Sequence, residues 1–166
     1  MTTKEIIQSQ YLATLEMLNQ AILQCPEDLW VDAKFGNQFW QIAYHALFYA
    51  HLYLQASEED FNPRNMHYEN AHRFSSPEPN FPGEGERDGS YHKEEILEFL
   101  DFCRQEVKEK VAELDLDADS GFDWIPFNKQ DLQFYNIRHL QHHTGELCER
   151  LGTAAGIDIQ WVGMMN

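Results

Sequence analysis

The segment RHLQHHTGEL, residues 138–147, carries three histidines within five positions: His139, His142 and His143. In a helix, His139 and His143 are one turn apart and could bind a single metal ion together. With Leu140 at the centre of the apolar stripe, these two lie roughly 60° to 100° to one side of it, and His142 lies on the opposite side. We therefore expect His139 and His143 at the edge of the core, and His142 in solvent or against a partner chain.

A second histidine helix is predicted from FWQIAYHALFYAHLYL, residues 39–54, which is apolar nearly all round, as is typical of a deeply buried helix. His45 shares a face with Ile42 and Tyr49, whereas His51 lies about 120° away. His45 is therefore the histidine expected to face another helix, and His51 is expected to have no metal role.

His45, His139 and His143 together would form a three-histidine site for a divalent metal ion. Because three neutral ligands leave the charge of the ion uncompensated, a bound water would become strongly acidic. Zinc or nickel is favoured by such a ligand set, although manganese and iron also accept it. In the alternative interpretation the three imidazoles only form hydrogen bonds in the core, and no ion is bound.

The elements that must position these residues are four amphipathic helices, predicted over residues 2–24, 37–57, 90–114 and 128–156. Helix caps are expected at Thr2, with Glu5 completing a capping box, at Asn37 and at Asn128, and a left-handed C-cap at Gly156. The pattern predicts an all-α fold, an antiparallel four-helix bundle in a single domain spanning residues 1–166, with a long crossover loop between the second and third helices.

The crossover loop, residues 58–89, is rich in proline and acidic residues. Loops of this length inside a compact domain often act as lids or binding loops. Its two histidines, His67 and His72, are expected at the surface unless the loop folds over the site. His92, at the start of the third helix, is expected in solvent.

Composition limits the function classes. The formal charge of −16 argues against binding to nucleic acid or to anionic membranes. No apolar run is long enough to span a membrane, and the N-terminal MTTKEIIQSQ lacks the pattern of a secretory signal. Because the three cysteines show no paired spacing, we expect no disulfide scaffold and a cytoplasmic protein.

An aromatic-rich helix with a central histidine, followed about ninety residues later by HLQHHTGEL, resembles the DinB-like superfamily over the whole chain. The resemblance implies a four-helix bundle, commonly a homodimer, with a divalent metal bound by His45, His139 and His143. Many members read HHRGQ where this chain reads HHTGE, so the polar residues Thr144 and Glu146 differ from that pattern.

The superfamily includes S-transferases that use a low-molecular-weight thiol and a thiol-dependent isomerase. The resemblance thus implies a metal-dependent enzyme of thiol S-transferase or hydrolase type, acting on a small molecule. Glu146 is a candidate to support a ligand, Tyr49 could line the cavity, and Cys148 is interpreted as a small buried hydrophobic residue. The alternative is a non-catalytic bundle, metal-binding or purely structural, that forms a homodimer.

Overall fold

The computed structural model describes residues 1–74 and 89–165, and within them the chain is all-helical, as predicted. The helices are α1 (Thr3–Gln24), α2 (Glu27–Trp30), α3 (Phe39–Tyr53), α4 (Lys93–Glu113) and α5 (Lys129–Ala155), with a 3-10 turn, η1, at Ala33–Phe35. Among the described residues the only β-type pairing is an isolated bridge between Asp119 and Asn128. The short elements α2 and η1 were not predicted.

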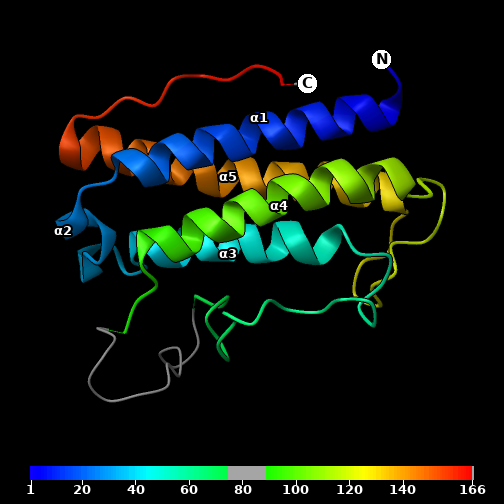
Figure 1. Ribbon diagram of the computed structural model, residues 1–166, viewed down its shortest axis with the longest axis horizontal. Coiled ribbons are helices and arrows are strands. Elements are labelled where there is room, and N and C mark those ends of the chain that lie inside the picture. Colours follow the sequence, from blue (N-terminus) through cyan, green and yellow to red (C-terminus); the bar gives the residue numbers. More distant parts are fainter. Residues whose placement is uncertain (75–88, 166) are drawn as a thin grey trace.

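The four long helices lie side by side, with α1 and α3 each in contact with both α4 and α5 (Figure 1). In this view α3 and α4 run in the same direction, so the chain between them returns along the length of the molecule. None of the described helices is both long and apolar enough to cross a membrane.

The predicted helix ends are correct at three places. Thr2 and Glu5 form the capping box of α1, the Asn128 side chain accepts a hydrogen bond from the Asp131 amide, and Gly156 ends α5 with a left-handed φ of 67°. The prediction succeeds at these ends because each cap depends on residues within one turn of the helix.

The ends of α3 and α4 differ from the prediction. Gln38, not Asn37, caps α3, because Gln38 and Gln41 form a capping box. The helix stops at Tyr53, four residues before the predicted Ser57. Helix α4 begins at Lys93, since a capping box of His92 with Glu95 places its start after the predicted Ser90.

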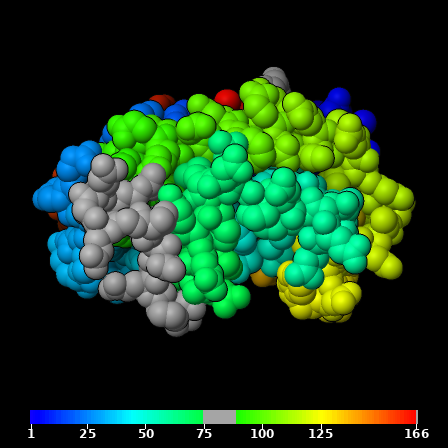
Figure 2. All heavy atoms as spheres, turned by 60° about the horizontal axis from the view of Figure 1, so that its bottom comes forward, coloured from blue at the N-terminus to red at the C-terminus, as the bar shows by residue number. Residues whose placement is uncertain are grey.

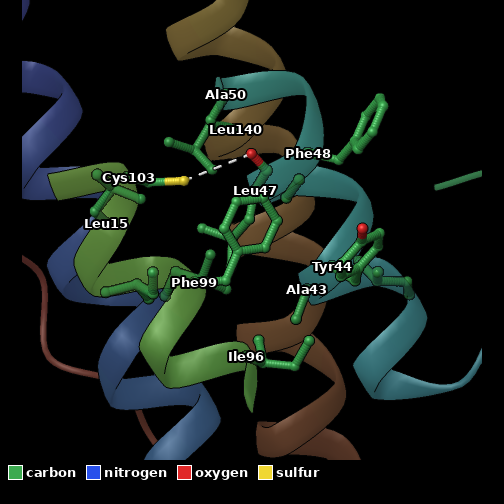
Figure 3. Close-up of a cluster of buried hydrophobic side chains, with 14 of the residues drawn as sticks. Leu15, Ala43, Tyr44, Leu47, Phe48, Ala50, Ile96, Phe99, Cys103 and Leu140 are labelled. Carbon is green, nitrogen blue, oxygen red and sulfur yellow. Dashed lines mark hydrogen bonds between the residues drawn. The ribbon is translucent and has the colours of Figure 1, made fainter. Parts of the chain in front are cut away.

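The core receives side chains from each long helix. Figure 3 shows Leu15 of α1, Leu47 of α3, Phe99 of α4 and Leu140 of α5 in one cluster, and each is at most 2% exposed. The Cys103 thiol donates to the Leu47 carbonyl oxygen at 3.7 Å. This packing fixes α3 against α5, the two helices that carry the predicted ligands.

The first part of the crossover, residues 54–74, lies as a layer over α3 (Figures 1 and 2). The Tyr91 hydroxyl donates to the Met66 carbonyl oxygen at 2.5 Å, and the Tyr44 hydroxyl lies 2.6 Å from His67 Nδ1. These bonds hold the segment near the face of α3 that bears His45. The remaining crossover residues, 75–88, lie outside the described part of the chain.

The C-terminal tail, residues 157–165, runs back along α1 (Figure 1). The Met165 amide donates to Ser9 Oγ at 3.2 Å, and Gln10 donates to the Gly163 carbonyl oxygen at 3.3 Å. The tail therefore packs on the helices as an extended piece.

Candidate metal centre

Helices α3 and α5 bring the three predicted histidines together. The Nε2 atoms of His45 and His139 lie 3.1 Å apart. The His143 ring centroid is 4.7 Å from each of the other two, and one ring nitrogen from each of the three residues lies within 4.8 Å of the others. The angular analysis of the two helices therefore selected residues that converge in space.

A hydrogen bond to Nδ1 orients two of the imidazoles. His45 Nδ1 lies 2.7 Å from the carbonyl oxygen of His72, which can only accept, so Nδ1 carries the proton and Nε2 keeps its lone pair. His143 Nδ1 lies 3.1 Å from Glu146 Oε2. Glu146 is in turn 3.8 Å from the buried guanidinium of Arg150. Such outer partners are typical of metal-binding histidines, because they fix the tautomer and the ring orientation.

The geometry between His45 and His139 fits a shared cation. Two nitrogens bound to one ion at about 2.0–2.1 Å each lie roughly 2.9–3.4 Å apart, and the observed separation is 3.1 Å. His139 Nδ1 is buried and has no hydrogen-bond partner among the described residues. The donor set, three imidazoles, therefore suits a divalent ion of the first transition series.

Burial keeps all three imidazoles neutral, the form that binds metals. Desolvation, together with the neighbouring histidines, lowers the pKa of His45 to about 3 and that of His139 to about 4. Desolvation also lowers the pKa of His143, although Glu146 opposes this shift. The centre therefore offers lone pairs rather than protons at neutral pH.

Aromatic rings cover one side of the centre. Phe74 stacks on His45, with ring centroids 4.0 Å apart, and meets His143 edge-on at 5.4 Å. Tyr49 contacts His45 at 4.8 Å and His139 at 5.4 Å. Tyr49 therefore lines the centre, as predicted, whereas Phe74 was missed because it lies in a loop without periodicity.

For His67 and His72 the structure shows the exception that the prediction allowed, because the loop folds over the site. Both are partly buried, and the His72 ring stacks on Phe48 with centroids 4.2 Å apart. The loop folds over α3 and supplies the carbonyl oxygen that accepts from His45. No sequence pattern marks this carbonyl, because any residue could provide it.

Three other residues lie largely where the sequence predicts. His92 and His142 are exposed. Cys148 is only half-buried, but it packs against the core, and burial raises the pKa of its thiol. A raised pKa disfavours the thiolate and hence a nucleophilic role.

His51 departs from the expectation that only His45 faces another helix. It is 4% exposed, and its Nε2 lies 3.8 Å from Glu106 Oε2 on α4. The prediction assumed that only one face of α3 meets another helix. This assumption does not hold, because α3 is covered on nearly all sides.

A cavity of about 250 Å³ opens beside the centre and is lined by Tyr135, Arg138, His139 and His142. Larger cavities lie elsewhere: one of about 460 Å³ between residues 62–66 and α4, and one of about 610 Å³ at residues 119–128. Neither of them contains a histidine of the centre. The smaller cavity is therefore the one placed for chemistry at the centre.

Comparison with known proteins finds a match to one protein family. The family model of the DinB superfamily matches residues 9–147, a range that includes all three histidines. The searches of curated proteins and of solved structures give no significant match. Because the matched range covers most of the sequence, the chain belongs to the DinB superfamily.

Proposed function

We propose that this chain is a divalent-metal-dependent enzyme of thiol S-transferase or hydrolase type, with zinc or nickel bound by His45, His139 and His143. The observation that carries the proposal is the convergence of three neutral imidazoles from two helices, with two Nε2 atoms 3.1 Å apart. Membership of the DinB superfamily supports it.

A divalent ion at this centre would lower the pKa of a water or of a low-molecular-weight thiol that it coordinates. The chain's own residues would prepare the site for this chemistry. The His72 carbonyl oxygen and Glu146 orient two ligands, and the rings of Phe74 and Tyr49 exclude water from one side. Exclusion of water strengthens electrostatic interactions within the site.

The proposal extends to the assembly. The four long helices would form an antiparallel bundle with residues 58–89 as the crossover, and two copies would associate as a homodimer. Large apolar side chains are exposed on α1 at Ile6 and Leu23 and on α5 at Phe134, and the contact between copies would involve these helices. The three free cysteines suit a reducing compartment, the cytoplasm.

Metal analysis of purified protein tests the proposal. We expect about one ion per chain in the wild type, and a loss of metal in the His45→Ala and His139→Ala variants. His92→Ala is the control, because His92 is an exposed histidine outside the centre. No bound metal after metal-replete, chelator-free growth would contradict the proposal and favour the structural homodimer.

Catalysis needs a separate measurement. Thiol-conjugation and hydrolysis substrates should be turned over by the metal-loaded wild type but not after chelation, and readdition of zinc or nickel should restore the rate. A rate that persists after complete removal of metal would contradict a metal-dependent reaction. Metal binding without any turnover of either substrate class would favour the non-catalytic bundle.

A further inference from the structure

The metal centre is closed on one side and accessible on another. Phe74 covers His45 and His143, and the His72 backbone holds the loop against His45. His139, in contrast, lines the cavity of about 250 Å³ that opens on α5. A reactant would therefore approach along α5, beside His139.

A second cavity lies next to the one at His139. A cavity of about 270 Å³, lined by Phe127, Asp131, Phe134, Tyr135 and Arg138, shares Tyr135 and Arg138 with the first. Their lining residues on α5 follow one stripe of the helix, from Asp131 to His142, and we call the two cavities together the α5 groove. Its length is about 16 Å, given a rise of 1.5 Å per residue.

Aromatic stacking links the α5 groove to the centre. The Tyr135 ring is nearly parallel to that of His139, with an interplanar angle of 6° and centroids 6.4 Å apart. The Arg138 guanidinium carbon lies 5.7 Å from the Tyr135 centroid, within the range of a cation–π contact. Arg138 is therefore held beside the metal ligand His139, with a positive charge facing the shared part of the groove.

No nearby carboxylate neutralises the Arg138 guanidinium. The chain has 28 acidic residues against 12 lysines and arginines, yet no carboxylate in the described part of the chain lies within ion-pair distance of Arg138. The carboxylate that lines the groove, that of Asp131, belongs to a residue two helical turns away. A guanidinium offers paired N–H donors that match a carboxylate.

We propose that the α5 groove admits the reactant, and that Arg138 binds a carboxylate group of that reactant while its reacting atom lies at the metal. This inference rests on the proposed metal centre. Arg138 would act as a specificity residue: it would favour acidic over neutral small molecules, and would have no part in binding the ion.

Two thiols that differ in a carboxylate test this assignment on the cobalt(II)-loaded protein. We expect 3-mercaptopropionate to bind about tenfold more tightly than neutral 2-mercaptoethanol, as followed by the thiolate-to-cobalt absorption band. Arg138→Gln should abolish this preference, and Arg138→Lys should retain part of it. Lys108→Gln, which removes an exposed charge on α4, should leave the preference unchanged.

The outcomes separate this inference from the proposed function. Failure of the wild type to bind cobalt would overturn the metal centre itself. Normal cobalt binding with equal affinity for the two thiols, with no thiol binding, or with a preference that survives in Arg138→Gln, would overturn the role of Arg138 alone. Cobalt affinity should be the same in Arg138→Gln and in the wild type.

Discussion

Two places in this molecule gather electron-pair donors in a buried setting, and they differ in what those donors hold. At residues 55, 56 and 120, three backbone carbonyl oxygens converge on the ammonium of Lys129, which is 3% exposed. At the metal centre, three imidazoles converge with no cationic side chain bonded between them. One group of donors has its cation within the chain, and the other does not.

The difference separates a structural site from the proposed metal site. Lys129 satisfies carbonyls at the end of α3, and Gly121 has a φ of 82° in a position where a Cβ would overlap the Ala56 carbonyl oxygen. In that site the three carbonyl oxygens already have a donor from the chain itself. At the centre, His139 Nδ1 remains without a partner among the described residues, and the pair of facing Nε2 atoms suits a cation from outside.

Of the substitutions predicted below, removal of the Lys129 ammonium should have the largest effect on the free energy of unfolding. Lys129→Met leaves three buried carbonyl oxygens without their donor and should lower the free energy of unfolding by about 3–5 kcal/mol. Urea denaturation of the metal-free protein measures this change.

The control is Lys108→Met on α4, an exposed lysine whose replacement should change the free energy by no more than about 0.5 kcal/mol. If the two variants were equally stable, Lys129 would not be the structural cation described above.

The metal centre should respond to pH where the Lys129 site does not. In the metal-free protein the pKa values of His45 and His139 lie below 6.5, at about 3 and about 4, so the unfolded state binds more protons under acid conditions. The contribution of these two histidines to the free energy of unfolding is therefore fully present above pH 6.5, and it is lost as the pH decreases towards 4. The loss is at most about 1.4 kcal/mol per pH unit for each histidine.

The measurement is the urea midpoint of the chelated protein at several pH values from 7.5 to 4.5. The His45→Ala variant should show a shallower dependence on pH than the wild type, since one of the depressed pKa values is removed. Lys108→Ala, an exposed substitution on α4, is the control and should keep the slope of the wild type. An unchanged slope in His45→Ala would contradict a neutral, buried His45.

The Lys129 site and the metal centre also differ in how well the sequence predicts them. The three histidines lie on regular helices, so the angle per residue was enough to select His45, His139 and His143 as residues that converge in space. The caps at Thr2, Asn128 and Gly156 were also predicted, because each cap involves near neighbours.

Features that depend on distant residues could not be predicted. Helix α3 was expected to reach Ser57, but Gln55 and Ala56 give their carbonyl oxygens to Lys129, which is more than seventy residues away. His72 supplies a bond to His45 from a loop without periodicity. His51 is buried because α4 covers a second side of α3. In each case tertiary contacts, not local pattern, decide the structure.

The smallest expected effect concerns the outer partner of one ligand. Glu146→Gln keeps the shape of the side chain but removes the charge beside His143 Nδ1, which weakens the orientation of that imidazole and its basicity as a ligand. We expect metal affinity to fall about tenfold, or about 1.4 kcal/mol, as measured by competition with a chromophoric chelator. Glu149→Gln, an exposed charge-matched substitution on the same helix, should leave the affinity unchanged. Equal affinities in the two variants would mean that the carboxylate contributes to α5 through Arg150 alone, and that the centre, like the Lys129 site, needs no outer support.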